Sequence, residues 1–237
     1  MLAMADRDAV LDLPLYSIGE AARLLEIVPS RLRRWLEGAR VHGTCYPPVI
    51  RPRPTGSGEV TWAEFVEAGL LREYRGRGVT LQHLRPFIDR MRVTYGVTHP
   101  LAHFEPLVDR PTGQLMVELR RLQDAVGLAE DLSLVRTVSG QLVWAEPMRA
   151  FLDKVEFDAA GIGRRMHPLG RAEPVVIDPG VAFGIPQIRG VRTEIIAEAI
   201  AAGEPPRRVV AGYGVTAEEV MAAVRWELRI QPRSRAA

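Results

Sequence analysis

The residues of this sequence best suited to chemistry are arginines placed at helical spacing after Pro29. A helix beginning there turns an apolar face inward, formed by Leu32, Trp35 and Leu36. Its outward positions carry one hydroxyl and three guanidinium groups, those of Ser30, Arg31, Arg33 and Arg34. Arginine can donate two hydrogen bonds to one guanine edge in the major groove, so we expect this face to contact DNA. The alternative is a solvated, charged helix surface.

Two further arginines, Arg51 and Arg53, alternate with prolines over residues 46–54, a segment that cannot be helical. Glycines at positions 56 and 58 predict a turn into the β-favouring residues 59–61. We interpret the segment as a two-stranded wing with both arginines on one arm. Arginines in such a wing suit contacts with phosphates or with the minor groove.

A third set of arginines lies in the last quarter of the chain and comprises Arg189, Arg192, Arg207 and Arg208. These side chains could make a second contact with phosphate or with a partner. Alternatively, Gly190 only supplies a backbone position with positive φ, and the arginines cap nearby carbonyl groups. The sequence leaves both interpretations open.

Metal and catalytic sites are not predicted. His42 and Cys45 lie three residues apart and His99 and His103 four apart, but no further Cys/His pair completes a zinc site. Acidic residues are scattered, and no phosphate-binding loop of the G-x-x-x-x-G-K-[ST] or G-x-G-x-x-G type occurs. We therefore expect no metal ion, no cofactor and no enzymatic activity.

The composition is that of a globular protein, since 47% of the 237 residues are hydrophobic and 25% are charged. The single cysteine, Cys45, cannot form an intramolecular disulfide, and no signal peptide is recognisable. No apolar stretch reaches the roughly 18–20 residues of a membrane span. We expect a cytoplasmic protein with no membrane contact.

Positive charge is concentrated in one part of the chain. The net charge is only +2, yet residues 31–92 contain twelve arginines and six acidic residues. A basic segment between flanks that are not basic is typical of a nucleic-acid contact surface.

The elements that must position these arginines begin at Ser17. Ser17 and Glu20 form a capping-box pattern, and an apolar stripe runs through the same helix to Leu25. Residues 26–28 are a short break before Pro29 opens the second helix. This pair predicts a helix-turn-helix.

Two more helices are predicted after the wing. Thr61 and Glu64 make a second capping box, and that helix stops at residues 76–78, where glycine recurs. Thr80 caps a helix that contains Pro86, which should kink the helix or delay its regular start.

This order of elements resembles the winged-helix domain of MerR-type regulators. The similarity is carried by Tyr16-Ser17-Ile18-Gly19-Glu20-Ala21-Ala22, by Leu32-Arg33-Arg34-Trp35 and by Arg75-Gly76-Arg77-Gly78-Val79-Thr80-Leu81. Two features depart from the family: Val28 stands where a polar N-cap usually precedes the proline, and the wing is rich in proline. The resemblance implies a DNA-binding domain over residues 15–95, after a flexible lead-in of residues 1–14.

Residues 96–173 predict a small antiparallel sheet with a helix across it, which by elimination would carry the dimer contact. The predicted strands are residues 114–119, 132–136, 140–144 and 155–157, and the predicted helix covers residues 147–154. Residues 161–170 are interpreted as a connector.

The C-terminal part, residues 174–230, predicts a strand at 175–179, an extended arm at 183–192 and three helices. The helices cover residues 193–202, 205–211 and 217–229, and Thr216 caps the last. Their shared core is expected to contain Ile195, Ile196, Ala199, Val209, Val210, Val220, Val224 and Leu228. The predicted fold is mainly α with small β elements: an N-terminal winged helix-turn-helix, a mixed α/β middle region and a C-terminal helical domain of helix-turn-helix size.

Residues 175–228 resemble a domain that ends many VapB-like antitoxins. The similarity is carried by the pattern Asp-Pro, Phe-Gly-x-Pro-x-Ile-x-Gly-x-Arg, Ala-Gly-x-Pro, Tyr, Thr-x-Glu-x-Val and Ala-Ala, which spans Asp178 to Ala223. Gly190-Val191-Arg192 stands where the usual motif is Gly-Thr-Arg, so one hydroxyl group is absent.

The two resemblances together imply a VapB-type antitoxin, a homodimer that binds its operator DNA and neutralises a PIN-domain ribonuclease toxin. Such toxins hold a divalent ion with acidic residues, which an arginine guanidinium can engage instead. Candidates for this role are Arg225 and Arg229 and, in the tail of residues 231–237, Arg233 and Arg235. In the alternative interpretation the C-terminus is frayed and solvated, and its arginines only complement the helix dipole. The alternative function is a MerR-like transcription regulator whose C-terminal half senses a ligand or partner.

Overall fold

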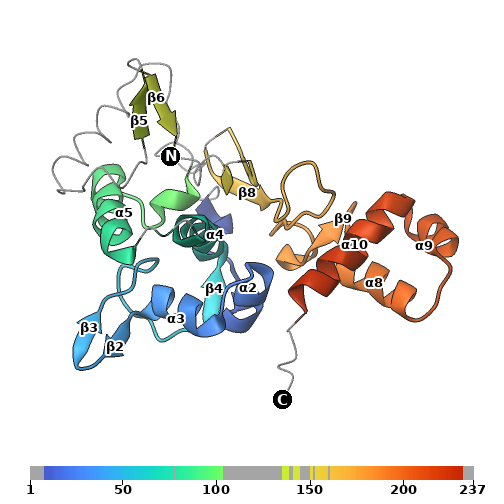
Figure 1. Cartoon of the computed structure of the whole chain (residues 1–237), viewed down its shortest axis with the longest axis horizontal. Coiled ribbons are helices and arrows are strands. Elements are labelled where there is room, and N and C mark those ends of the chain that lie inside the picture. Colours follow the sequence, from blue (N-terminus) through green and yellow to red (C-terminus); the bar gives the residue numbers. More distant parts are fainter. Residues whose placement is uncertain are drawn as a thin grey trace.

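The structure, a computed structural model, describes residues 8–76, 78, 80–103, 135–138, 141–144, 150–151, 153–159 and 161–231. It combines α-helices with small two-stranded antiparallel sheets, as predicted (Figure 1). The N-terminal helices lie on one side of the molecule and the C-terminal helices on the other, with short strands between them. None of the described helices has the length and apolar composition needed to cross a membrane.

The first helix pair forms where the sequence predicts it. A short helical turn, η1 (Asp8–Val10), and strand β1 (Pro14–Ser17) lead into α2 (Ile18–Leu24) and α3 (Pro29–Glu37). The capping box of α2 is confirmed, because the Glu20 amide donates to Ser17 Oγ at 3.2 Å and the Ser17 amide donates to Glu20 Oε2 at 2.8 Å. Val28 precedes α3 without a side-chain cap, and Pro29 occupies the first turn.

The predicted wing is wrong in its position. The hairpin consists of β2 (Ala39–Val41) and β3 (Thr44–Tyr46), before the proline-rich segment, while β4 (Glu59–Thr61) pairs with β1. His42 and Gly43 join the hairpin with φ angles of 48° and 82°, and a tight hairpin turn of this length favours positive φ at both positions. Val60 of β4 is fully buried, which explains why this strand packs inside instead of projecting.

Two longer helices follow, α4 (Trp62–Gly76) and α5 (Leu81–Tyr95), and then the short turn η2 (Pro100–Ala102). The second capping box is confirmed, since the Glu64 amide donates to Thr61 Oγ1 at 3.3 Å. α5 is helical from Leu81, so Pro86 does not delay its start. α4 is buried over most of its length and is the central helix of this side.

The middle region is described as two hairpins. β5 (Val135–Val138) pairs with β6 (Gln141–Trp144), and β7 (Val155–Phe157) pairs with β8 (Gly163–Met166). The predicted strands at 140–144 and 155–157 are confirmed, whereas residues 163–166 form a strand and not part of a connector. The predicted strand at 114–119 lies outside the described residues. Of the helix predicted at 147–154, positions 150 and 151 are helical, 153 and 154 form a turn instead, and the other four lie outside the described residues.

The C-terminal part begins with η3 (Ala182–Gly184), β9 (Gln187–Ile188) and β10 (Val191–Arg192). The three predicted helices are confirmed as α8 (Thr193–Ala201), α9 (Pro206–Tyr213) and α10 (Ala217–Ile230). The strand predicted at 175–179 is reduced to single bridges from Val176 and Ile177.

The core of these helices differs from the prediction at two positions. Ile196, Val209 and Val220 are buried as expected, and Trp226 joins them with no exposed surface. By contrast, Ile195 and Leu228 are exposed. The buried face of α8 runs through Thr193, Ile196 and Ala199, and that of α10 through Ala223, Trp226 and Ile230. Ile195 and Leu228 lie off these faces.

The two sides of the molecule are joined by buried hydrogen bonds and a continuous hydrophobic core. The Tyr16 hydroxyl donates to the Gly184 carbonyl at 2.7 Å, and Trp62 Nε1 donates to the Gly163 carbonyl at 2.7 Å. Gly184 has a φ of 74°, and a Cβ atom there would overlap the Tyr16 hydroxyl. Glycine at this position therefore allows the close approach.

Candidate nucleic-acid interface

The basic face of α3 is held outward by an apolar face that packs into the core. Leu32, Trp35 and Leu36 are at most 2% exposed, so the helix cannot rotate without disrupting this packing. The structure brings all four predicted side chains to the exposed side of the helix, namely Ser30, Arg31, Arg33 and Arg34.

The guanidinium groups of this face are available to a ligand. Within the part of the chain that the structure describes, Arg31, Arg33 and Arg34 form no ion pair with a carboxylate. The first turn of α3 also contains no acidic residue. A row of unpaired positive charges on one exposed helix face attracts a polyanion such as DNA.

Arg51 lies inside the molecule and not on an exposed wing, which corrects the prediction. Its side chain is 4% exposed, and it donates to Glu64 from Nε at 2.6 Å and from Nη2 at 3.0 Å. It also pairs with Glu37 and donates to the Glu59 carbonyl. A buried guanidinium needs such partners because an unpaired charge away from water is costly. The role of Arg51 is therefore structural.

Glu37 connects this buried cluster to the end of α3. Its carboxylate accepts hydrogen bonds from the Thr55 amide at 2.9 Å and the Gly56 amide at 2.8 Å, and it pairs with Arg51. The pKa of Glu37 is lowered: burial opposes ionisation, but these hydrogen bonds and the charge of Arg51 outweigh it. These hydrogen bonds connect the proline-rich loop to the end of α3, so the loop fixes the orientation of the helix.

The β2–β3 hairpin projects beside α3 in place of the predicted wing (Figure 1). Arg40 in β2 is exposed, and Arg53 is exposed in the segment after the hairpin. Neither arginine has an ion-pair partner among the described residues, so both can reach a phosphate. Arg40 was not among the predicted contact residues, although Gly43 between two short β-favouring runs indicates this hairpin.

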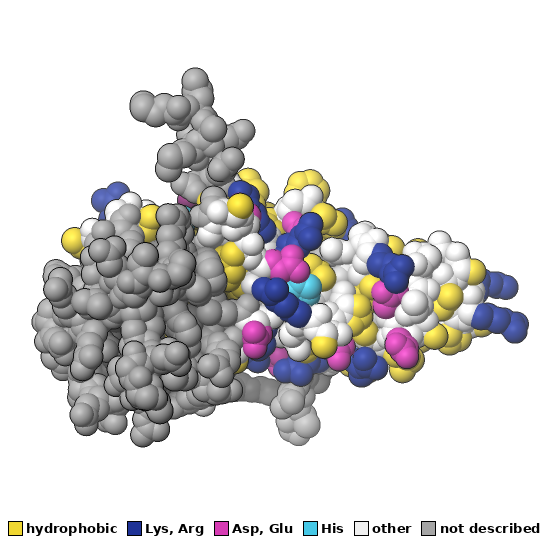
Figure 2. All heavy atoms as spheres, turned by 90° about the horizontal axis from the view of Figure 1, so that it is seen from above, with side chains coloured by type: hydrophobic (Ala, Val, Ile, Leu, Met, Phe, Trp, Pro, Cys, Tyr) yellow, Lys and Arg dark blue, Asp and Glu magenta, His cyan; other side chains and the backbone are white. Residues whose placement is uncertain are grey.

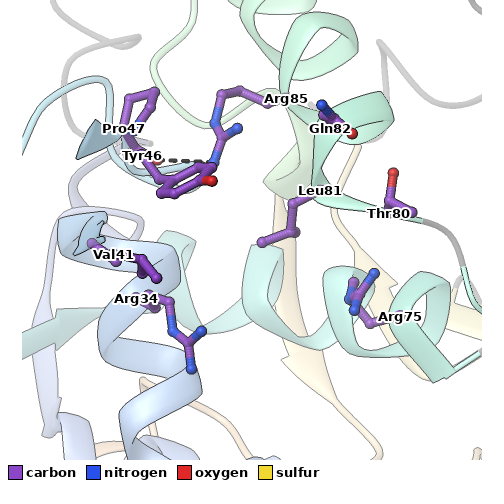
Figure 3. Close-up of a pocket in the computed structure, with 10 residues that line it drawn as sticks. Arg34, Val41, Tyr46, Pro47, Arg75, Thr80, Leu81, Gln82 and Arg85 are labelled. Atoms are coloured by element: carbon purple, nitrogen blue, oxygen red, sulfur yellow. Dashed lines mark hydrogen bonds between the residues drawn. The ribbon is translucent and has the colours of Figure 1, made fainter. Parts of the chain in front are cut away.

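A cleft of about 520 Å³ opens beside α3, between the hairpin and the start of α5 (Figure 3). Three helices each contribute an arginine to its lining, Arg34 from α3, Arg75 from α4 and Arg85 from α5. Leu81 adds apolar surface, and Arg85 points toward the hairpin and donates to the Pro47 carbonyl at 2.9 Å. No local sequence pattern indicates this cleft, because its arginines come from three separate helices.

The arginines of the C-terminal part are not brought together with those of α3. Arg189 pairs with Glu219 at 2.8 Å, whereas Arg192, Arg207 and Arg208 are exposed and have no ion pair within the described ranges. Arg207 and Arg208 belong to α9, at the end of the molecule farthest from the α3 side, where Figure 2 shows positive side chains.

The candidates for toxin neutralisation are divided between α10 and the tail. Arg225 lies 3.7 Å from Glu173, and Arg229 lies 2.8 Å from Glu26 in the turn between α2 and α3. Such exposed ion pairs contribute little free energy, so both arginines can exchange them for another carboxylate. Arg233 and Arg235 lie outside the described residues.

Among the described residues, no three His, Cys, Asp or Glu side chains come together as a metal site. Cys45 is exposed in β3, and His99 contacts Glu67, with 2.9 Å between His99 Nδ1 and Glu67 Oε2. His42 lies in the turn between β2 and β3, and His103 forms a β-bridge with Ile162.

Comparison with known proteins finds a family match in the C-terminal part and relatives over nearly the whole chain. Residues 175–226 match a family model described as a protein of unknown function, DUF433. Two Mycobacterium tuberculosis proteins are similar along nearly their whole length: "Putative antitoxin VapB45" is 29% identical over 90% of this chain and 93% of its own, and "Uncharacterized protein Rv2308" is 28% identical over 91% of each. The crystal structure of Rv2018 from the same organism has a TM-score of 0.72 and 28% identity, covering 90% of this chain and 99% of that one. The predicted similarity to a VapB-type antitoxin is confirmed in sequence.

Proposed function

We propose that this protein is the antitoxin of a type II toxin–antitoxin module, which binds operator DNA and neutralises a PIN-domain ribonuclease. The observation that carries the DNA-binding role is the row of exposed, unpaired arginines on α3. The similarity to "Putative antitoxin VapB45" over nearly the whole chain supports the antitoxin role.

In this proposal residues 15–95 are a MerR-like winged helix-turn-helix domain. α3 enters the major groove, where Ser30, Arg33 and Arg34 contact base edges. The β2–β3 hairpin serves as the wing, and Arg40 and Arg53 bind phosphates. A homodimer assembled through residues 96–173 would present two copies of α3 to two half-sites of the operator.

The C-terminal part, residues 174–230, is proposed to bind the toxin. The protein acts by binding and not as an enzyme, and both activities belong to the cytoplasm. Repression and neutralisation are then carried by different elements of one molecule, α3 for the DNA and α8 to α10 for the toxin.

Co-expression with the protein encoded by the neighbouring open reading frame tests the proposal. We expect the two chains to elute together in size-exclusion chromatography, and we expect the complex not to cleave RNA that the partner alone cleaves. The complex or the free chain should also retard DNA from its own promoter region. A partner that neither binds nor cleaves RNA would contradict the antitoxin role.

A MerR-like regulator that senses a small ligand is the second candidate. The cleft lined by Arg34, Arg75 and Arg85 favours it, because a ligand there would contact α3 directly. An isolated gene, with promoter binding but no ribonuclease partner, would support this alternative.

A further inference from the structure

An apolar groove of about 360 Å³ runs between α8 and α10 and reaches Arg23 of α2. Ala197 and Val224 form part of its lining, and Leu228 stands 63% exposed at its side. A leucine this exposed gains little from the fold of its own chain, and beside a groove it offers an anchoring contact for another chain.

The rim of this groove is acidic. Glu194 and Glu198 of α8 are exposed and have no ion pair among the described residues, and Glu227 of α10 lines the same groove. Arg23 is the single basic residue of the lining, so three carboxylates face one guanidinium. The groove therefore complements a segment that is apolar and positively charged.

The Glu227 carboxylate is half-buried and accepts a hydrogen bond from Thr193 Oγ1 at 2.5 Å. Its pKa is raised, above all by burial. The neighbouring charges of Glu194 and Glu198 raise it further, against the opposing hydrogen bond from Thr193 and the charge of Arg23. A cationic side chain in the groove would relieve this repulsion.

We propose that the α8–α10 groove holds a basic amphipathic segment of the partner ribonuclease, with an aliphatic side chain against Leu228 and cationic side chains against Glu194 and Glu198. This inference rests on the proposed function, because the partner is taken to be an RNA-cleaving protein. Such a protein must present basic side chains to RNA phosphates. The carboxylates of the groove take the place of those phosphates, so they hold the docked segment to this chain.

The groove also reaches the last described residue before the tail. Gln231 belongs to its lining and is the last described residue, so Arg233 and Arg235 follow it within a few positions of the sequence. Docking by the groove and neutralisation by these arginines are separate contacts, and a variant can remove one without the other.

The test uses the full-length chain and the protein encoded by the neighbouring reading frame, with affinity measured by titration calorimetry. Leu228→Gln should weaken the complex by about tenfold or more, since it removes an anchor without adding charge. Glu194→Gln combined with Glu198→Gln should weaken it by about tenfold at low salt and flatten the dependence of affinity on salt.

Matched controls lie in α10 and in the loop after α8, outside the groove. Met221→Gln replaces another exposed apolar residue of α10, and Glu204→Gln with Glu218→Gln removes two other exposed carboxylates. These controls should change the affinity less than about twofold, as surface substitutions usually do. Equal reductions in controls and groove variants, or no reduction in the groove variants, would overturn the proposal.

A second probe separates failure of the groove from failure of the proposed function. A synthetic amphipathic helical peptide of leucine and lysine should bind the wild-type chain and bind Leu228→Gln more weakly. The corresponding peptide of leucine and glutamate should not bind. If the neighbouring protein fails to bind but the lysine peptide binds as described, the proposed function is wrong and the groove chemistry stands. If the lysine peptide also binds the wild-type chain no more tightly than Leu228→Gln, the groove proposal is wrong.

Discussion

Arg51 shows how one buried residue fixes the surface that is proposed to bind DNA. Its guanidinium joins Glu37 at the end of α3 to Glu64 at the start of α4, and its side chain is only 4% exposed. Because charges in such a cluster compensate one another away from water, removing one leaves the others unpaired. The orientation of α3 thus depends on residues that cannot touch DNA themselves.

Replacing Arg51 by alanine should lower the free energy of unfolding by about 3–5 kcal/mol, the usual cost of breaking a buried ion pair from one side. Urea titration followed by circular dichroism measures this change. Arg53→Ala is the matched control, because Arg53 is exposed and unpaired within the described chain, and it should change stability by about 0.5 kcal/mol or less. Equal stability of the two variants would refute the structural role of Arg51.

His99 gives the fold a dependence on pH above about pH 6.5, the ordinary pKa of a histidine. Burial lowers its pKa, but the charge and the hydrogen bond of Glu67 raise it more, so the pKa lies above its ordinary value of about 6.5. The stabilisation that the pairing of charged His99 with Glu67 contributes is complete below about pH 6.5, and it is lost as pH rises through the raised pKa. Urea titrations at a series of pH values measure the free energy of unfolding. As pH rises through the raised pKa, this free energy should fall less steeply for His99→Gln than for the wild-type protein. An unchanged slope would show that His99 is not the group responsible.

At the scale of elements, local patterns predicted the helices well and the strand pairing poorly. The capping boxes at Ser17, Thr61 and Thr216 each involve a partner three residues away, so the sequence alone located these helix starts. The pairing of β4 with β1 joins segments more than forty residues apart, which no local pattern reveals. For the same reason the α3 face could be predicted, whereas the burial of Arg51 and the three-helix cleft could not.

The tail is the element on which neutralisation is expected to depend. Deleting residues 231–237 removes Arg233 and Arg235, the two cations that follow α10. We expect the truncated protein to bind promoter DNA with unchanged affinity, and we expect the ribonuclease activity of the complex to return because the guanidinium groups no longer occupy the acidic site. An RNA-cleavage assay on the co-purified complex measures this. Full inhibition by the truncated protein would move the neutralising surface into residues 175–230.

At the scale of the whole molecule, specific polar contacts join the two sides in addition to the continuous hydrophobic core. The Tyr16 hydroxyl donates to the Gly184 carbonyl at 2.7 Å across 168 positions of sequence, and Arg229 of α10 pairs with Glu26 in the turn before α3. These contacts tie the C-terminal part to β1 and to the turn before α3.

Tyr16→Phe should destabilise this junction by about 1–3 kcal/mol, because the Gly184 carbonyl is left buried without its donor. Hydrogen exchange should accelerate around residues 182–188, while the amides inside α3 remain protected. Tyr213→Phe removes an exposed hydroxyl and serves as the control. Unchanged exchange at this loop would mean that the hydrogen bond does not hold the two sides together.

The most direct measurement of the central claim is the affinity of the protein for DNA from its own promoter region. Arg33→Ala combined with Arg34→Ala should weaken binding by about 1–3 kcal/mol for each arginine that reads a base, with the fold intact by circular dichroism. Arg207→Ala with Arg208→Ala changes the charge equally at the opposite end of the molecule and should weaken binding much less. If the folded α3 variant binds as tightly as the wild-type protein, or if the two double variants are weakened equally, α3 is not the DNA-reading element.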